Sequence, residues 1–435
     1  MKVALINHGC AKNLVDAELI LGILENKGYK ITLDDSEADI VIVNTCSFIH
    51  DAEKESVQSI LEMIENGKKV IVSGCLSQKH KEDLKEAIPE LSGMIGTSNL
   101  NDIVEIIQNI EQGNEYKSII QEKPEYIYPE EVTRQQITMG ASSYLKIGEG
   151  CNYKCGYCII PKLRGKYISR PIENIVKEAK ELVAKGVSEI ILIAQDTSSY
   201  GIDLYGKQAL PKLLEELNKI ENLSWIRIMY AYPTQMTDEL IDAIARLDKV
   251  VKYVDIPLQH SHPRVLESMR RPVMDYAKLV EKIRKKIPGV SVRTSLIVGY
   301  PGETEEEFEH LYNFVKNVRF DRMGAFEYSR EKGTYSYSLK NQIPAKIKKQ
   351  RRKRLMELQQ QISLENNQNY IEKEIKCIVE GYTDDGVIIL RSEHDAPEID
   401  GVVYASSETP VVPGDIETVK ITGADEYDLF GEIIE

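Results

Sequence analysis

The chain has 435 residues, of which 42% are hydrophobic and 29% are charged, so it is long enough for roughly two to four globular domains. Its 69 acidic residues exceed its 55 basic ones and give a net charge of −14, which disfavours general coating of nucleic acid. No apolar run approaches the roughly 18 residues of a membrane span, and polar residues interrupt the N-terminus before a signal-peptide core could form. We therefore expect a cytoplasmic protein with no membrane partner, whose seven cysteines stay reduced and bind metal or do chemistry.

The first part of the chain, residues 1–116, alternates strand and helix patterns. This alternation predicts an α/β domain with a parallel sheet that is covered by helices on both faces. The predicted strands are Lys2–Asn7, Asp39–Asn44 and Lys69–Ser73, and the predicted helices are Leu14–Asn26, Ala52–Asn66 and one that begins near Gln78. Residues 111–136 are polar and contain Pro124 and Pro129, so they are predicted to be a linker.

A longer series of strands and helices follows over residues 137–367. Because its six predicted strands are fewer than the eight of a closed (β/α) barrel, we expect an open, partial (β/α)6 barrel. The strands are Tyr144–Ile147, Glu189–Ala194, Trp225–Tyr230, Tyr253–Ile256, Ser291–Val298 and Met323–Tyr328. The helices between them include Ile172–Lys185, Leu210–Lys219, Asp238–Leu247, Tyr276–Lys286 and Glu305–Val318.

The C-terminal part of the chain begins with one long helical pattern, Pro344–Tyr370. A basic run at its start, Lys346–Arg354, is expected either to contact RNA or to form the solvated face of a connector. Residues 370–435 then hold short strand patterns with turn signals between them, which predict a small all-β barrel. Cys377 lies on one of these strands and is expected in the core.

Cys151, Cys155 and Cys158 form a C-x3-C-x2-C motif directly after the first predicted barrel strand. Three thiolates on one tight loop can bind three irons of a [4Fe-4S] cluster and leave the fourth iron open to a substrate or cofactor. The alternative is a structural zinc site, but such sites favour paired C-x2-C units with a fourth ligand nearby, and none lies close in the sequence.

Cys10, Cys46 and Cys75 each follow a predicted strand of the N-terminal sheet, although they are 36 and 29 residues apart. Open α/β sheets bind their ligands at the carboxyl ends of parallel strands. The shared position therefore predicts a second cluster with three cysteine ligands and one open iron. The alternative is three unrelated buried thiols, because free cysteine often acts as a small hydrophobic residue.

The C-x3-C-x2-C motif on the first loop of a partial barrel resembles the radical S-adenosylmethionine (SAM) superfamily. This resemblance implies that SAM binds the open iron of that cluster and is cleaved to a 5′-deoxyadenosyl radical, with electrons from a donor such as a flavodoxin-type protein. The turn Gly299-Tyr300-Pro301-Gly302-Glu303 matches the family's glycine-containing turn near the adenine of SAM. Gly299 and Gly302 are therefore candidate SAM-binding residues.

Further motifs extend the resemblance to nearly the whole chain. Gly9-Cys10-Ala11-Lys12-Asn13, Asn44-Thr45-Cys46 and Gly74-Cys75, followed by C-x3-C-x2-C and a small β domain, resemble the methylthiotransferases. The resemblance implies a methylthiotransferase domain at 1–116, a radical SAM core at 137–367 and a TRAM domain at 370–435. It also implies that an auxiliary [4Fe-4S] cluster on Cys10, Cys46 and Cys75 carries the sulfur, and that a second SAM supplies the methyl group.

The methylthiotransferases have two branches with different substrates. One modifies adenosine in transfer RNA, and the other modifies the β-carbon of an aspartate in ribosomal protein uS12 (S-twelve of the small subunit). The segments Gly9–Asp16, Ala194–Gly201 and Asp425–Gly431 resemble the protein-modifying branch. A transfer-RNA enzyme remains the alternative. A non-catalytic two-cluster electron carrier is a third hypothesis. Such carriers usually have four cysteines per cluster, whereas each triad here has three.

Charge gives an independent argument about the substrate. Residues 371–435 contain 17 acidic residues and four basic ones. Their net charge of −13 accounts for nearly all of the chain's net charge of −14. RNA binding needs a cationic surface, so this segment is expected to attract a basic protein; solubility is the alternative explanation. Contact between the basic run and ribosomal RNA around the target is a secondary expectation.

Several polar residues at or near predicted strand ends could line the active site, although a loop-stabilising role is as well supported for each and none is assigned as catalytic. His260 in particular is expected to satisfy backbone carbonyls in a turn. These residues are Gln195, Asp196, Tyr200, Tyr230, Tyr232, Gln259, His260 and Arg293.

Overall fold

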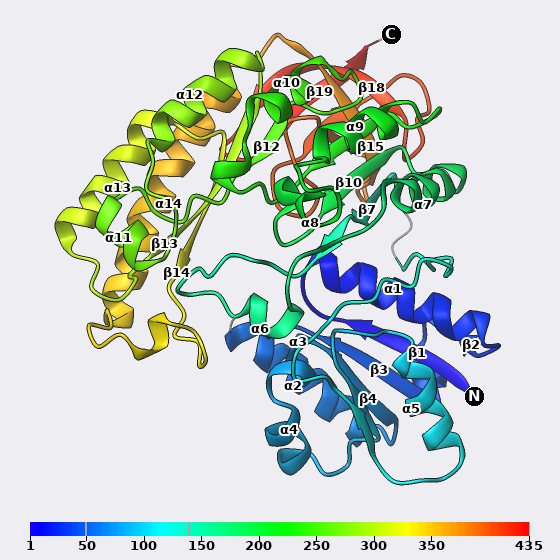
Figure 1. Cartoon of the computed structure of the whole chain (residues 1–435). Coiled ribbons are helices and arrows are strands. Elements are labelled where there is room, and N and C mark those ends of the chain that lie inside the picture. The colour runs from blue at the N-terminus through cyan, green and yellow to red at the C-terminus, as the bar shows by residue number, and fades with distance from the viewer. Residues whose placement is uncertain (48–49, 138–139, 435) are drawn as a thin grey trace. The chain divides into compact units, whose positions relative to one another are not determined.

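The computed structural model of the chain describes residues 1–47, 50–137 and 140–434 (Figure 1). The chain divides into two compact units. Unit 1 contains Met1–Met139, Gly148–Lys154 and Cys158–Arg170, and unit 2 contains Gly140–Ile147, Cys155–Tyr157 and Pro171–Glu435. No helix in the described part of the chain is both long and apolar enough to cross a membrane.

Unit 1 is built on a six-stranded sheet in which every neighbouring pair is parallel. The strand order is β2-β1-β3-β4-β5-β6, so the three predicted strands β1, β3 and β4 lie side by side in its centre. The strands are β1 (Lys2–Asn7), β2 (Lys30–Ile31), β3 (Ile40–Thr45), β4 (Lys69–Gly74), β5 (Gly93–Ile95) and β6 (Lys117–Ile119). The predicted parallel α/β fold is confirmed, and β2, β5 and β6 are added to it.

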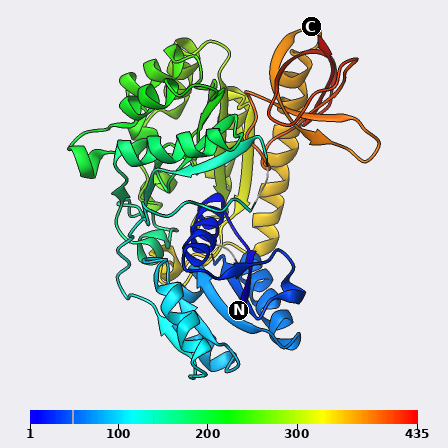
Figure 2. The ribbon, with the colours of Figure 1, turned by 90° about the vertical axis from the view of Figure 1, so that its right-hand side faces the viewer.

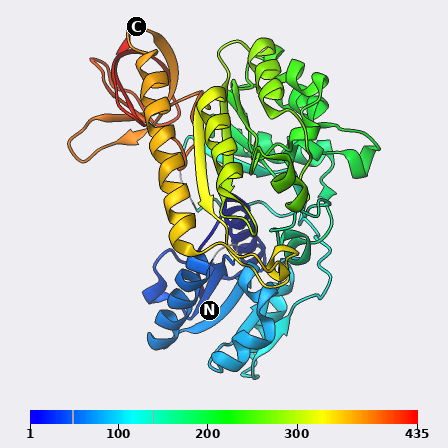
Figure 3. The same cartoon turned by 90° about the vertical axis from the view of Figure 1, so that its left-hand side faces the viewer.

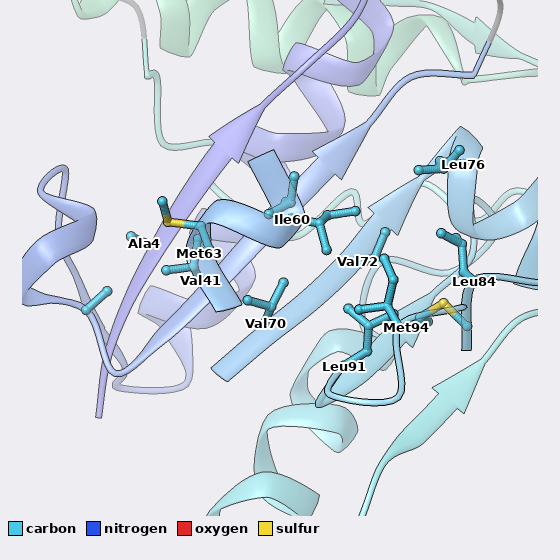
Figure 4. Close-up of a cluster of buried hydrophobic side chains, with 13 residues drawn as sticks. Ala4, Val41, Ile60, Met63, Val70, Val72, Leu76, Leu84, Leu91 and Met94 are labelled. Carbon is cyan, nitrogen blue, oxygen red and sulfur yellow. The ribbon is translucent and has the colours of Figure 1, made fainter. Parts of the chain in front are cut away.

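Helices cover both faces of this sheet, which explains why all six residues of β3 are buried. On one face, Val41, Val70 and Val72 pack against Ile60 and Met63 of a helix (Figure 4). That face is covered by α2 (His50–Glu65), α3 (Cys75–Lys79) and α4 (Lys81–Ala87). The other helices of the sheet, which pack on each other, are α1 (Ala11–Asn26) and α5 (Asp102–Glu111).

Residues 111–136 fold as part of unit 1, so the prediction of a linker there is wrong. The strand β6 lies inside this stretch and pairs with β5. Farther along, the Tyr126 hydroxyl donates to the Asp16 carboxylate at 3.2 Å, and Arg134 Nε lies 3.0 Å from Glu18. A three-residue strand gives too short an apolar pattern to be recognised in a polar sequence.

Six strands of unit 2 form two three-stranded parallel sheets, ordered β11-β10-β7 and β12-β13-β14. The two sheets adjoin where the Val251 N–H donates to the Ile226 carbonyl at 3.0 Å. In the described residues no ladder joins β7 to β14, so the predicted open barrel is confirmed. The strands are β7 (Ser142–Lys146), β10 (Glu189–Ile193), β11 (Trp225–Ile228), β12 (Tyr253–Asp255), β13 (Ser291–Val298) and β14 (Arg322–Glu327).

Helices alternate with these strands as the sequence predicts. They are α7 (Ile172–Ala184), α8 (Ile202–Tyr205), α9 (Leu210–Asn218), α10 (Asp238–Arg246), α11 (Pro263–Ser268), α12 (Tyr276–Lys286) and α13 (Glu305–Val318). Two short strands, β8 (Gly148–Glu149) and β9 (Ile168–Ser169), and the helix α6 (Ile160–Arg164) follow β7 along the chain but belong to unit 1.

The long helix α14 (Ala345–Gln368) packs along β14 and α13 and leads into the C-terminal barrel (Figures 2 and 3). This barrel is closed in the order β15-β16-β17-β19-β18, which confirms the predicted small all-β barrel. Cys377 lies in its core, as predicted. The strands are β15 (Glu374–Tyr382), β16 (Ile388–Ser392), β17 (Val403–Ser406), β18 (Ile416–Ala424) and β19 (Leu429–Ile434).

Buried charges hold the C-terminal barrel to the rest of unit 2. The Glu189 carboxylate at the start of β10 accepts from Arg227 on β11 at 2.8 Å and from Arg391 on β16, and none of the three side chains is more than 1% exposed. Burial alone would raise the pKa of Glu189, but the two guanidiniums lower it to about 2. Arg322 and Asp395 form a second link of 2.6 Å.

Candidate cluster and cofactor sites

Cys10, Cys46 and Cys75 follow the three central strands of the sheet in unit 1. Cys46 and Cys75 come directly after β3 and β4, and Cys10 comes three residues after the end of β1. Because these strands are parallel neighbours, the three cysteines lie at the same edge of the sheet. Cys10 caps the N-terminus of α1, and Cys75 is the first residue of α3.

Two glycines allow the chain segments with these cysteines to pack closely. Gly9 has a φ of +116° and Gly74 has a φ of +93°, so both are in the region that favours glycine. A Cβ atom on Gly9 would lie 2.9 Å from Cβ of Cys46, and one on Gly74 would lie 2.6 Å from the Thr45 carbonyl oxygen. Each glycine therefore brings the cysteine that follows it close to the end of β3.

A network of amide side chains joins the ends of the three strands. Asn44 donates to the Asn7 side chain at 2.8 Å and to the Asn13 carbonyl at 2.7 Å, and its own oxygen accepts from Ser73 at 2.8 Å. Asn13 in turn donates to the Thr45 carbonyl at 2.9 Å. Asn13 and Asn44 belong to the motifs recognised in the sequence, but their structural role could not be predicted, and Ser73 was missed.

The electrostatic environment differs between two of these thiols. Burial raises the pKa of Cys75, and the Arg164 guanidinium only partly opposes this. Crowding by protein atoms would also raise the pKa of Cys10, but the positive charges of Lys12 and Arg164 lower it below its usual range. Since the thiolate is the form that binds metal, positive charge beside these sulfurs favours ligation.

The described part of the chain contains no three Cys, His, Asp or Glu side chains that converge on a single metal ion. Three cysteines on neighbouring strand ends supply the ligands of a cluster in which each thiolate binds a different iron and one iron stays open.

The C-x3-C-x2-C loop is held by backbone hydrogen bonds within each unit. In unit 1, the Cys151 N–H donates to the Gly165 carbonyl at 3.1 Å. In unit 2, Gly156 donates to the Met269 carbonyl at 2.7 Å and accepts from the Ser336 N–H at 2.8 Å. Cys151, Cys155 and Cys158 are all half-buried, so fixed backbone is combined with thiols that are partly accessible.

The glycine-containing turn after β13 lies beside this loop within unit 2. Gly299 and Gly302 have φ values of +73° and +80°, and the Glu303 carboxylate accepts from the Gly299 N–H at 2.8 Å. The Tyr300 hydroxyl would lie 2.9 Å from a Cβ atom on Gly156. The turn thus lies next to the segment of Cys155 within unit 2.

The space at Gly299 is filled by the chain itself. A Cβ atom there would lie 2.4 Å from Cγ of Lys348 on α14. Glycine at this position is therefore explained by the backbone conformation and by the packing of α14. Contact of Gly299 and Gly302 with SAM stays a prediction.

Most of the other candidate residues stabilise loops. The Asp196 carboxylate caps the turn that follows β10 and accepts from the Ser198 N–H at 3.1 Å. Ser198 Oγ in turn accepts from the Tyr232 N–H at 2.7 Å. Tyr200 is completely buried. Tyr230 has a positive φ of 62°, and its N–H donates to Asp255 at 3.0 Å.

Gln195, which follows β10, is half-buried. Gln259 extends the ladder along β13, since its N–H donates to the Ser295 carbonyl and its carbonyl accepts from the Ile297 N–H. Arg293 lies 3.0 Å from Asp255 and 3.4 Å from Asp400 in an ion-pair network, which gives it a structural role.

His260 is a turn residue, but its partner differs from the one expected. Its Nδ1 accepts from the His262 N–H at 3.0 Å rather than donating to a carbonyl. The residue is completely buried, and burial lowers the pKa of His260 to about 3. The imidazole is therefore neutral near pH 7.

Two buried arginines beside the cysteines were missed by sequence reasoning. Arg164 Nη2 lies 3.4 Å from Sγ of Cys75 within unit 1. Arg271 Nη1 lies 3.9 Å from Sγ of Cys155 within unit 2, and its guanidinium stacks over the Tyr232 ring at 4.3 Å. Arg164 is only six residues from Cys158, but Arg271 has no spacing relation to any cysteine.

Three family profiles match separate parts of the chain. They are the radical SAM superfamily at residues 145–315, the uncharacterized protein family UPF0004 at residues 2–96 and the TRAM domain at residues 371–434. The three matches follow one another along the chain without overlap.

Relatives that align with the whole chain establish the family to which it belongs. The chain is 50% identical over 436 residues to the ribosomal protein uS12 methylthiotransferase RimO of Caldanaerobacter subterraneus, covering 99% of both chains. It is 47% identical to the protein of that name from Thermoanaerobacter sp., again covering 99% of both, and 46% identical to that of Clostridioides difficile, covering 100% of this chain and 99% of the relative. The chain belongs to the RimO methylthiotransferase family.

Membership of the RimO family makes the protein a radical SAM enzyme that transfers a sulfur-containing group. The non-catalytic electron carrier is thereby excluded. Among solved structures, the methyltransferase TsrM of Kitasatospora setae, with cobalamin and a [4Fe-4S] cluster bound, has a TM-score of 0.57 at 15% identity and covers 75% of this chain and 72% of its own. The radical SAM enzyme OxsB has a TM-score of 0.50 at 13% identity, with coverage of 77% and 54%. These likenesses concern the fold alone.

Proposed function

We propose that this chain attaches a methylthio group to the β-carbon of an aspartate in ribosomal protein uS12. The observation that carries the proposal is its similarity to uS12 methylthiotransferases over 99% of both chains. The two cysteine triads, one at the sheet edge of unit 1 and one in the C-x3-C-x2-C motif, are what such a reaction requires.

Cys151, Cys155 and Cys158 are assigned to one [4Fe-4S] cluster, and Cys10, Cys46 and Cys75 to the auxiliary cluster. When bound, the first cluster and SAM supply a radical that can take hydrogen from an unactivated carbon, for which no general base would suffice. The chain itself contributes the thiolates and the turn at Gly299–Glu303, which we assign to SAM. An electron donor of the flavodoxin type and a cytoplasmic location complete the proposal.

The surface of the C-terminal barrel favours a protein substrate. Of its four basic residues, Arg391 is buried against Glu189, and Lys420 pairs with Glu372 at 3.0 Å. Asp395 and Asp400 are buried, but they are only two of the 17 acidic residues in this segment. The remaining acidic surface would repel phosphate and attract a basic ribosomal protein.

The basic run of α14 is partly committed to ion pairs. Arg351 lies 2.8 Å from Glu303 and 3.0 Å from Glu305, and Arg354 lies 2.6 Å from Glu309. This pairing fixes α14 on α13. It favours the interpretation that the basic run belongs to a connector rather than to an RNA-binding surface. Lys346, Lys349 and Lys353 stay exposed, so contact with ribosomal RNA would be secondary.

Mass spectrometry of uS12 and of transfer RNA, from cells with and without the gene, tests this proposal. We expect one aspartate of uS12 to carry a methylthio group only in cells with the gene, while transfer RNA is the same in both. Loss of a methylthio group from transfer-RNA adenosine instead would assign the chain to the alternative substrate.

A further inference from the structure

Arg164 ends the short helix α6, and its side chain is only 2% exposed. It belongs to the segment Cys158–Arg170, which folds as part of unit 1. Taking a charged guanidinium out of water is unfavourable unless its N–H groups are paired. The partners of Arg164 therefore show what the buried charge is for.

Four groups surround the guanidinium. Nη1 lies 2.6 Å from Asp16 Oδ2 and 3.3 Å from Glu149 Oε2. Nη2 lies 2.5 Å from Asn13 Oδ1 and 3.4 Å from Sγ of Cys75. One nitrogen is thus occupied by carboxylates, and the other bonds a side-chain amide and approaches a cysteine sulfur.

Asn13 connects Arg164 to the segments of the other two cysteines. Its Nδ2 donates to the His8 carbonyl at 3.2 Å, two residues before Cys10, and to the Thr45 carbonyl at 2.9 Å, directly before Cys46. Its Oδ1 accepts from Arg164. One guanidinium therefore contacts Cys75 directly and is bonded, through a single amide, to the backbone that precedes Cys10 and Cys46.

We propose that Arg164 is a positioning residue of the auxiliary centre. The inference rests on the proposed function, since it takes Cys10, Cys46 and Cys75 as ligands of a cluster. Arg164 holds the Cys75 sulfur in place and, through Asn13, fixes the other two ligand segments. Its positive charge and N–H group also favour the reduced, more negative cluster, because hydrogen bonds to sulfur and nearby charge set cluster potentials.

A purely structural role is the competing explanation, in which Arg164 only docks α6 on Asp16. Substitutions would then change the stability of the chain but not the properties of a cluster. The experiment therefore needs readouts taken on the cluster itself.

The test uses the full chain with Cys151, Cys155 and Cys158 changed to Ala, so that only the auxiliary centre can bind iron. In this parent, Arg164→Met removes the charge and Arg164→Lys keeps it without the planar N–H fork. Arg134→Lys is the matched control, because Arg134 is another buried arginine of unit 1 and its partner is Glu18, 3.0 Å away. Iron content, the electron paramagnetic resonance spectrum and the midpoint potential are measured after anaerobic reconstitution.

We expect Arg164→Met to shift the midpoint potential to a more negative value and to weaken iron retention by about 10–100-fold, as removal of an outer-shell partner of a metal ligand does. Arg164→Lys should keep a midpoint potential close to the parent's but change the electron paramagnetic resonance spectrum. Arg134→Lys should leave the iron content, the spectrum and the midpoint potential at the parent's values. If Arg164→Met does not fold, the Lys variant alone decides. Its thermal unfolding is measured as well, because a changed spectrum at an unchanged unfolding temperature cannot come from docking.

The outcomes distinguish a failure of the cluster assignment from a failure of the role of Arg164. A parent that binds no iron would refute the auxiliary cluster itself. A parent that binds about four irons, with both Arg164 variants at its potential and spectrum, would refute the role of Arg164 and leave the cluster assignment standing.

Discussion

At the scale of single residues, glycines shape the cysteine segments. Gly9, Gly74 and Gly150 each precede a cysteine, and each has a positive φ. At each of them a Cβ atom would come closer than 3 Å to another part of unit 1. A residue without a side chain therefore lets each cysteine segment pack against backbone or against another cysteine.

Replacing Gly74 by Ala tests this packing. Positive φ costs a residue with a Cβ about 1–2 kcal/mol, and the contact with the Thr45 carbonyl adds an overpacking cost of about 1–3 kcal/mol. Gly67 is the matched control, because its φ is +74° but nothing lies within 4 Å of a Cβ there. We expect Gly74→Ala to lower the thermal midpoint more than Gly67→Ala and, unlike it, to reduce the iron content. Equal effects of the two changes would contradict the packing argument.

The cysteines could be found from the sequence because thiolates are chemically distinctive and strand ends can be recognised from apolar runs. Arg164 and Arg271 could not, because an arginine in a sequence carries no sign of whether it is buried. Their contacts with Cys75 and Cys155 depend on how distant segments fold together. The same applies to Asn44 and Ser73, whose bond joins neighbouring strands 29 residues apart.

At the scale of elements, the two cysteine triads are predicted to hold separate clusters. Anaerobic reconstitution should give about eight irons per chain, on the stoichiometry of two [4Fe-4S] clusters. Changing Cys151, Cys155 and Cys158 together to Ala should remove half of them, since the cysteines of unit 1's sheet edge are untouched. Cys377→Ala is the control, because this thiol lies in the core of the C-terminal barrel. Full iron content in the triple variant would show that the motif holds no cluster.

The two triads should also differ in the reaction that they support. Without Cys151, Cys155 and Cys158, we expect no 5′-deoxyadenosine from SAM under reducing conditions. Without Cys10, Cys46 and Cys75, SAM cleavage should continue while uS12 gains no methylthio group. Both products are measured by mass spectrometry on the same reaction mixture. Methylthiolated uS12 from a variant that lacks the second triad would rule out its role as the auxiliary centre.

Long elements with a clear period were predicted well, and short or polar ones were not. The barrel strands and the helix α14 lie close to where their patterns placed them, because many residues contribute to each pattern. Strands β2 and β6 have only two and three residues and are held by pairing with a neighbouring strand rather than by their own apolar character. Sequence periodicity cannot reveal that kind of stabilisation.

At the scale of the whole molecule, the buried ion pairs of Glu189 with Arg227 and Arg391 explain how the C-terminal barrel is held within unit 2. Glu189→Gln leaves Arg227 and Arg391 buried without their carboxylate, which should cost about 3–5 kcal/mol. The folded pKa of about 2 lies below the unfolded value of 4.5, so the stabilisation is complete above pH 4.5 and is lost as pH falls towards 2. Thermal unfolding from pH 6 to pH 3 should therefore depend less on pH in the variant.

Glu216 provides the control for this pH dependence. Its pKa is also lowered to about 2, by Lys212 and Lys219, but these groups lie at the surface, where water and salt screen them. We expect Glu216→Gln to leave the thermal midpoint unchanged. If the two variants behaved alike, burial of the Glu189 pair would not be the source of the stabilisation.

The last prediction concerns how the whole molecule meets its substrate. An acidic C-terminal barrel should speed association with a basic ribosomal protein, and this steering weakens with salt because exposed charges are screened beyond about 8 Å at physiological ionic strength. Asp425 is unsuitable for a test, because it accepts from the N–H groups of Tyr427 and Asp428 at 2.9 and 2.7 Å and so shapes a turn. The exposed acids Asp384, Glu408 and Glu432 are changed to Asn, Gln and Gln instead.

We expect this triple variant to bind uS12 more slowly than the parent and with a flatter dependence on salt, as measured by stopped-flow or surface-based kinetics. The control is Glu62→Gln, Glu65→Gln and Glu86→Gln, which removes the same charge from exposed positions on α2 and α4. Because screening limits steering to charges near the docking surface, the control should keep the parent's rate. Equal slowing in both variants would mean that only net charge matters, and productive binding of transfer RNA by the first variant would favour the RNA-modifying branch.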